Sequence, residues 1–215
     1  MTYLELVNGV LRRIREEEVT TVSGSTYAKM IGDFVNDAKT MVENAWDWSA
    51  LRTTLTLTTE PNIFNYALVG SQNRIKVLDA LNDTSNFFLE YRGSSWFNDK
   101  YLNSSTAALG TPANYNFNGI DANGDTLVDV YPKPNDVYDL RFNVVQRTPD
   151  LSLDGDTLTV PHLPVLHLTV ALAARERGET GGTSTAEYFG IADSYLSDAI
   201  ALDGGRHPEE LVWYS

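Results

Sequence analysis

The stretch Asn44-Ala-Trp-Asp-Trp-Ser-Ala-Leu-Arg-Thr-Thr-Leu-Thr-Leu57 contains an abrupt change of hydrophobic period. Before it, apolar residues recur three and four positions apart, as they do along one face of a helix. From Leu51 onward, leucine alternates with arginine and threonine, which is the period-two pattern of a half-buried strand. The stretch therefore predicts a helix that leads directly into a β-rich segment.

The segment before this change has the pattern of two amphipathic helices. Apolar residues recur at helical spacing across residues 3–14 and again across residues 27–45. Thr2 and Glu5 have the spacing of a capping box, in which both side chains accept hydrogen bonds from backbone N–H groups at the helix start. Ser23-Gly24-Ser25 is typical of a turn with a second helix cap. We therefore expect two helices that pack antiparallel to each other.

The segment after the change has the period of antiparallel strands. Alternation or short apolar runs predict further strands at residues 63–69, 74–79, 87–91, 115–120, 127–131, 138–144 and 157–160. Asn123-Gly124 and Asp154-Gly155 are turn dipeptides, and the first predicts a type I′ hairpin turn. A small β-sheet or a sandwich is the natural closure of these strands.

Helical spacing returns after Pro161. Residues 163–173 are apolar nearly all round, which indicates a helix that is buried on most of its sides, and a second helix follows. The prediction is an α+β fold, in which N- and C-terminal helices form a bundle and a central antiparallel β-sheet or sandwich is inserted. The expected parts are a helical hairpin at 1–50, a β-rich domain at 51–160, a helical pair at 161–203 that completes the bundle, and a docking tail at 204–215.

Composition and charge exclude several classes of protein. No apolar stretch approaches the roughly 18 to 20 residues that a membrane span requires. The chain opens without a basic segment followed by an apolar core, so we expect no secretory signal and synthesis inside the cell. The absence of cysteine excludes disulfides, thiol nucleophiles and cysteine-bound zinc. The formal net charge of −13 disfavours nucleic-acid binding through a basic face, but it does not forbid a wall along which nucleic acid slides without sticking.

A search for the residue patterns of enzymes and metal sites gives no site. His162 and His167 are five positions apart, so they lie on different faces of a helix and do not suit one metal ion. Asp121-Ala-Asn-Gly-Asp125 has alternating oxygen ligands, but its glycine occupies the fourth place of the run and not the sixth that a calcium loop requires. A hairpin turn is the favoured interpretation. We expect no enzyme, no cofactor and no metal.

Two groups of aromatic residues stand outside the expected core. The segment Leu211-Val-Trp-Tyr214 lies beyond a Gly-Gly pair and contains anchor residues that are typical of interfaces. Docking on a partner and folding back onto the same chain are both open for this tail, and the same two possibilities are open for Trp96 and Phe97. Residues 94–112 have the composition of a long insertion between strands, and they carry Trp96, Phe97 and Tyr101. Both groups are candidate contact residues.

The order of these elements resembles a known family. The chain is similar to head-to-tail adaptors of short-tailed bacteriophages, of the tail tubular protein A type, over nearly its full length. The likeness lies in the opening Tyr3-Leu-Glu-Leu-Val-Asn-Gly-Val-Leu-Arg-Arg-Ile-Arg-Glu-Glu17, the helix end at Trp46 and Trp48 with its immediate strand, the β-rich middle, and the two closing helices with a tail. The length of residues 94–112 and the bulk of the β region depart from the simplest adaptors.

This resemblance implies a structural virion protein that forms a homo-oligomeric ring, usually of about twelve copies. The ring would lie in the neck between the portal protein and the tail nozzle protein of the tail tubular protein B type. Genome DNA would pass through it without sequence-specific binding, no membrane is involved, and the chain would be made in the bacterial host cytoplasm. On this interpretation Leu211, Val212, Trp213 and Tyr214 dock on the portal or a neighbouring copy, and Trp96, Phe97 and Tyr101 contact the nozzle or a tail fibre.

A carbohydrate-binding β-rich module is the alternative function. Aromatic faces stack on sugars, and Trp96, Tyr101 and Tyr115 are the residues that would supply such faces. The flanking helices and the lack of a secretory signal argue against this alternative. A glycosidase is weaker still, because no motif locates a pair of catalytic carboxylates.

Overall fold

The computed structural model describes residues 1–72, 74–102, 107–178 and 184–205. The chain divides into two compact units. The helical unit contains Met1–Leu51 and the described residues from Thr148 onward, and the β unit contains Arg52–Arg147. The β unit is therefore inserted between two parts of the helical unit, and the mixture of helices with mainly antiparallel sheets is the expected α+β class.

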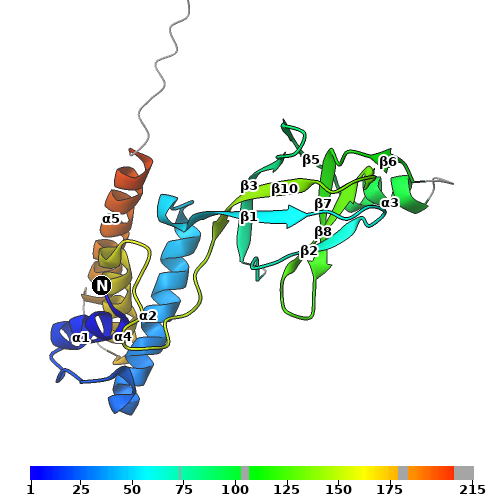
Figure 1. The fold of residues 1–215 in the computed structure, drawn as a ribbon. Coiled ribbons are helices and arrows are strands. Elements are labelled where there is room, and N and C mark those ends of the chain that lie inside the picture. The colour runs from blue at the N-terminus through cyan, green and yellow to red at the C-terminus, as the bar shows by residue number, and fades with distance from the viewer. Residues whose placement is uncertain (73, 103–106, 179–183, 206–215) are drawn as a thin grey trace, which may run out of the picture. The chain divides into compact units, whose positions relative to one another are not determined.

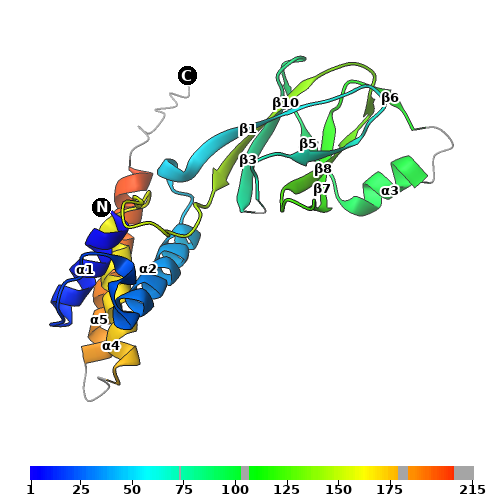
Figure 2. The same cartoon turned by 60° about the horizontal axis from the view of Figure 1, so that its bottom comes forward.

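The helical unit is a bundle whose central member is the third of its four α-helices. These are α1 (Tyr3–Arg13), α2 (Thr26–Ala45), α4 (His162–Glu176) and α5 (Ser184–Gly204), with short 3-10 turns η1 (Val22–Gly24) and η2 (Ser49–Leu51). Helix α4 contacts α1, α2 and α5, as Figures 1 and 2 show. Its buried residues from Pro164 to Ala174 occupy most of its circumference, which confirms the helix predicted to be buried on most sides.

Both predicted helix caps are present. The hydroxyl of Thr2 accepts from the Glu5 N–H at 3.2 Å, and the Glu5 carboxylate accepts from the Thr2 N–H at 2.8 Å. The hydroxyl of Ser25 accepts from the Ala28 N–H at 3.0 Å. These contacts satisfy backbone donors that the first helical turn leaves without partners, so they fix where α1 and α2 begin.

Side chains of α2 hold the segment in which the chain returns to the helical unit. Asn36 exchanges two hydrogen bonds with the backbone of Leu151, at 2.9 and 3.1 Å. Lys39 Nζ donates to the Thr148 carbonyl at 2.9 Å and lies 3.2 Å from the Glu43 carboxylate. The Thr148 hydroxyl donates to that same carboxylate at 2.6 Å. The Lys39–Glu43 pair is buried, with each side chain 1% exposed.

The β unit is a sandwich of two four-stranded sheets. One sheet has the order β1 (Arg52–Thr58), β10 (Asp139–Gln146), β3 (Ile75–Asn82), β4 (Phe87–Phe88). The other has the order β2 (Asn65–Leu68), β8 (Thr126–Tyr131), β7 (Asn114–Ile120), β5 (Glu90–Tyr91). A parallel pair of short strands joins β6 (Leu109–Gly110) to β9 (Lys133–Pro134).

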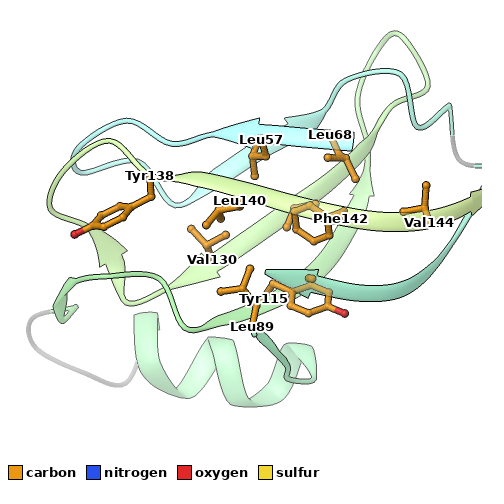
Figure 3. Packing of buried hydrophobic residues seen from close by; sticks show 11 residues of the cluster. Leu57, Leu68, Leu89, Tyr115, Val130, Tyr138, Leu140, Phe142 and Val144 are labelled. Atoms are coloured by element: carbon orange, nitrogen blue, oxygen red, sulfur yellow. The ribbon is translucent and has the colours of Figure 1, made fainter. Parts of the chain in front are cut away.

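The core of the β unit lies between these two sheets, as Figure 3 shows. Alternate residues of β10 point inward, and among them Leu140, Phe142 and Val144 are fully buried. The ring of Tyr115 on β7 meets the ring of Phe142 edge to face, with 5.5 Å between centroids. The cluster thus draws side chains from both sheets, which is the arrangement of a sandwich.

Two details of the sequence prediction are wrong, and one helix was not predicted. Residues 157–160 do not form a strand, because only Thr157 pairs, in an isolated bridge with Thr2 inside the helical unit. The β7–β8 hairpin does not contain a type I′ turn, because that turn requires two residues with positive φ and Gly124 is the only one in residues 120–126. The long insertion expected at residues 94–112 contains helix α3 (Ser94–Leu102), which was not predicted.

Candidate functional site

Helix α3 lies against the second sheet through two of the predicted contact residues. Phe97 is 3% exposed. The hydroxyl of Tyr101 donates to the Val130 carbonyl at 2.5 Å, and its ring stacks on Phe64 with centroids 4.5 Å apart. Burial, and secondarily the nearby charge of Asp129, raises the pKa of Tyr101. Phe97 and Tyr101 therefore anchor α3 to the sheet.

The third predicted contact residue, Trp96, is half-buried on the same helix. Its ring meets Tyr131 edge to face at 5.2 Å. Lys100 lies 5.6 Å and Arg92 lies 5.8 Å from the centroid of the indole ring. The accessible part of Trp96 is thus flanked by two cations, in contrast to the negative net charge of the chain.

Two expectations about these aromatic residues need correction. Phe97 is buried, so it cannot itself touch a nozzle or a fibre in this conformation. Tyr115 is 8% exposed and packs in the core of the sandwich, so it cannot supply an open face for a sugar. The exposed aromatic platform that a carbohydrate-binding module needs is therefore not formed by Trp96, Tyr101 and Tyr115.

The predicted docking residues Leu211, Val212, Trp213 and Tyr214 lie outside the residues that the structure describes. The described part of the chain ends just after α5, where Asp203 is 8% exposed. Its carboxylate accepts from the Trp46 indole N–H at 3.1 Å and from the Ser49 N–H and hydroxyl at 2.9 and 2.6 Å. The last turn of α5 is thereby tied to the segment that follows α2.

The acidic loop that resembles part of a calcium site uses its oxygens within the protein. Asp121 accepts from the N–H groups of Asn123 and Asp125, both at 2.8 Å. Asp125 accepts from the N–H groups of Gly70 and Gln72, both at 3.0 Å. No group of three or more histidine, aspartate or glutamate residues that would suit a metal ion occurs among the described residues. Within those same residues, no helix has the length and apolar character of a membrane span.

A cavity of about 510 Å³ lies at the N-terminal end of α1 in the helical unit. Its lining includes Tyr3, Lys29, Asp33 and Asp154. The Tyr3 side chain is 5% exposed, and its hydroxyl packs against Gly32, where an added Cβ would lie only 2.3 Å from the oxygen. Burial, and then the charges of Asp33, Asp150 and Asp154, raises the pKa of Tyr3. The lining thus carries two carboxylates, of Asp33 and Asp154, and one ammonium group, of Lys29.

Arginines gather at the opposite end of α1. Arg12 pairs with Glu18 at 2.8 Å, and Arg177 pairs with Glu16. Arg13 and Arg15 line a smaller cavity of about 320 Å³ together with Tyr188. Arg15 has a φ of 61°, which is the left-handed conformation that glycine adopts most readily.

Among the described residues, no histidine lines either cavity. His167 stacks on Tyr195 with centroids 4.5 Å apart. Burial, and secondarily the charge of Arg13, lowers the pKa of His167. His162 is exposed at the start of α4, and His207 lies outside the described residues. The histidines thus make no joint site in the described part of the chain.

Sequence reasoning missed both cavities, and for different reasons. The residues around Tyr3 come from four segments, namely α1, the turn at η1, α2 and the loop near Asp154, so no local motif could have shown them together. The conformation of Arg15 was hidden because a glycine normally marks the left-handed residue after a helix. Here arginine takes that place.

The chain matches the sequence model of a known protein family. The sequence model of the SU10 adaptor protein family matches residues 1–210, a range that spans both units. No curated protein sequence matches the chain. Because the family match covers the helical unit and the β unit together, the chain belongs to the SU10 adaptor protein family, a family of structural head-to-tail adaptors of the phage neck.

Proposed function

We propose that the protein forms a homo-oligomeric ring of about twelve copies between the portal protein and the tail nozzle protein, in the manner of tail tubular protein A. Genome DNA passes through the ring without sequence-specific binding. The observation that carries this proposal is the family match across residues 1–210, because it includes both units and not one of them alone.

The charge of the chain supports the role in a DNA channel. The formal net charge is −13. A wall of this sign repels the phosphate backbone, so DNA moves along it without the contacts that would hold it in place. Of the two cations beside Trp96, Arg92 already pairs with Glu90 at 2.6 Å, so Lys100 is the one that suits a contact with an acidic group of a partner.

Exposed apolar residues of the helical unit support assembly with other subunits. Helix α5 packs mainly against α4. Its Leu202 is 70% exposed and its Ile191 is 43% exposed. Apolar surface of this kind on a helix is typical of a face that a partner covers.

The proposed contacts with neighbouring tail components use both units. Leu211, Val212, Trp213 and Tyr214 dock on the portal or on a neighbouring copy. The α3 surface around Trp96 contacts the nozzle or a tail fibre, and Phe97 and Tyr101 hold α3 in place for that contact. This division of roles follows the burial of Phe97 and the hydrogen bond of Tyr101.

The direct test is capture of the purified chain by the portal ring of the same phage, measured by the mass of the complex. A matched variant of equal length replaces Leu211, Val212, Trp213 and Tyr214 with serine. We expect stoichiometric capture of the unmodified chain and at least about tenfold weaker capture of the variant, since anchor residues carry most of the binding free energy of an interface. A chain that remains a monomer and ignores the portal would contradict the proposal, and glycan binding would be the next property to measure.

A further inference from the structure

The cavity at the start of α1 is lined by the largely buried Tyr3 and by the carboxylates of Asp33 and Asp154. No hydrogen bond of the Tyr3 hydroxyl occurs among the described residues, although the side chain is only 5% exposed. Asp33 lines the same cavity from an exposed position on α2, and no ion pair of Asp33 occurs among those residues either. Lys29 is the one cation in the lining. The cavity thus offers a carboxylate and a phenolic oxygen to a positively charged group.

Arg15 occupies a backbone position that favours a different amino acid. The N–H of Glu16 donates to the Leu11 carbonyl at 2.9 Å, and the N–H of Arg15 donates to the Arg12 carbonyl at 3.3 Å. This pair of hydrogen bonds is a Schellman motif, in which the left-handed residue is usually glycine. The helix dipole explains why arginines occur in the last turn of α1. It does not explain why arginine, and not glycine, occupies position 15, where a side chain strains the left-handed backbone.

The side chain of Arg15 is available for a partner. It is exposed, and it makes no ion pair with any residue that the structure describes. Of the three acidic residues that follow Arg15, Glu16 pairs with Arg177 and Glu18 pairs with Arg12, whereas Glu17 is exposed and makes no ion pair with Arg15. The cavity that Arg13 and Arg15 line contains no acidic residue. An acidic group from another molecule is the missing complement.

The two complementary features lie on different parts of one surface. Tyr3 begins α1 and Arg15 follows its end, so about 16 Å of helix separates them. A single copy therefore presents a carboxylate cavity at one end of α1 and an unpaired guanidinium at the other. Contacts between unlike patches are heterologous, and repetition of such a contact closes a ring when the rotation between copies is suitable.

We propose that Arg15 of one copy inserts into the cavity beside Asp33 of the next copy. The guanidinium group donates to the Asp33 carboxylate in the forked geometry that arginine and carboxylate share, and a remaining donor reaches the Tyr3 hydroxyl oxygen. The cavity is therefore completed by a residue of the neighbouring subunit. This inference rests on the proposed ring, for which it identifies one contact.

Cross-linking tests the contact directly, because the natural chain contains no cysteine. An Arg15→Cys chain and an Asp33→Cys chain are mixed on the portal ring and treated with a short bismaleimide. The control replaces Asp33→Cys with Asn44→Cys, an exposed site on α2 that lies about 16 Å farther along the helix. We expect a mixed dimer in the first mixture and at least about tenfold less in the control. Equal yields in both mixtures, or dimers of like chains alone, would overturn the contact.

Charge reversal provides the second measurement. Asp33→Arg and Arg15→Glu should each weaken association between copies on the portal by about tenfold or more, the loss expected for a charge-assisted pair. The double variant should restore association, whereas Arg74→Glu, in the β unit, should leave it unchanged. Arg15→Gly should also weaken association while it relieves the left-handed backbone, so a folding defect cannot account for the loss.

The outcomes separate this inference from the proposed function. If the portal captures the unmodified chain and every variant equally, the adaptor role stands and the Arg15–Asp33 contact is wrong. The contact is also wrong if the double variant remains as weak as the single variants. If the unmodified chain neither binds the portal nor associates with itself, both proposals fail together.

Discussion

Substitution of Glu43 by leucine should destabilise the helical unit strongly. Lys39 and Glu43 are each 1% exposed and lie 3.2 Å apart. Thr148 completes the group, because its carbonyl accepts from Lys39 at 2.9 Å and its hydroxyl donates to Glu43 at 2.6 Å. Glu43→Leu leaves the ammonium group of Lys39 buried with a single carbonyl acceptor, and it leaves the Thr148 hydroxyl without its carboxylate.

The expected loss in the free energy of unfolding follows from the charge of Lys39 that Glu43→Leu leaves buried. Removing one member of a buried ion pair costs about 3–5 kcal/mol, because the other charge remains without compensation. The double variant Lys39→Met/Glu43→Leu removes both charges and fills the space with apolar groups of similar size, so its loss should be smaller, about 0–2 kcal/mol. The two substitutions should therefore be coupled by roughly 2 kcal/mol or more.

The assay must report on the helical unit, since a chain of two units does not have to unfold in one step. Hydrogen exchange of the α2 amides, measured by mass spectrometry over a series of urea concentrations, gives the free energy of opening for that helix. Lys39→Met alone is the matched control, because it leaves the carboxylate of Glu43 with the Thr148 hydroxyl. A loss below about 1 kcal/mol for Glu43→Leu, or a double variant equal to the sum of the singles, would refute the reasoning.

Three further predictions test other contacts. Asp203→Ala removes the acceptor for two donors of Ser49, so the free energy of unfolding of the helical unit should fall by about 1–3 kcal/mol in urea titrations, and an unchanged value would contradict this assignment. Gly32→Ala should destabilise the helical unit by about 1–3 kcal/mol, because the new Cβ would lie 2.3 Å from the Tyr3 hydroxyl oxygen. The loss should be smaller when Tyr3 is replaced by phenylalanine, and an equal loss in that background would contradict the explanation. Burial raises the pKa of Tyr101 in the folded state, so its contribution to stability is present below the ordinary tyrosine pKa of about 10 and is lost as the pH rises above it. Tyr101→Phe should therefore reduce the loss of stability between about pH 9 and about pH 11, and an identical pH profile would contradict that effect.

Most of the fold was visible in the sequence because its signals are local. The change of period near Trp48, the Thr2 and Ser25 caps and the all-round apolar character of α4 each depend on neighbouring residues, and each was predicted correctly. Helix α3 was missed because its serine- and asparagine-rich setting suggested a loop. The spacing of Phe97 and Tyr101, four residues apart on one helical face, was the signal that could have identified it.

The candidate contact site was much less predictable. Tyr3, Asp33 and Asp154 are far apart in the sequence, and only tertiary packing brings them to one cavity. Arg15 carries no sign of its left-handed backbone, because the residue type that usually reveals such a position is absent there. The burial of Phe97 and Tyr115 also depends on how the sheets and α3 pack, so composition alone suggested that both were exposed.

The pairing of β1 with β10 has a consequence for how this protein can evolve. These strands carry the chain into and out of the β unit, and Arg52 pairs with Val145 across them. Paired residues of adjacent strands lie about 5 Å apart, so the two ends of the β unit are as close together as the ends of a tight hairpin. The β unit therefore begins and ends at neighbouring positions, so its insertion into the chain of the helical unit requires no more space between the two connections than a short loop does. Such a module can be exchanged, enlarged or replaced by a turn without rerouting the rest of the chain, which allows the β unit to diverge while the bundle keeps its own sequence requirements.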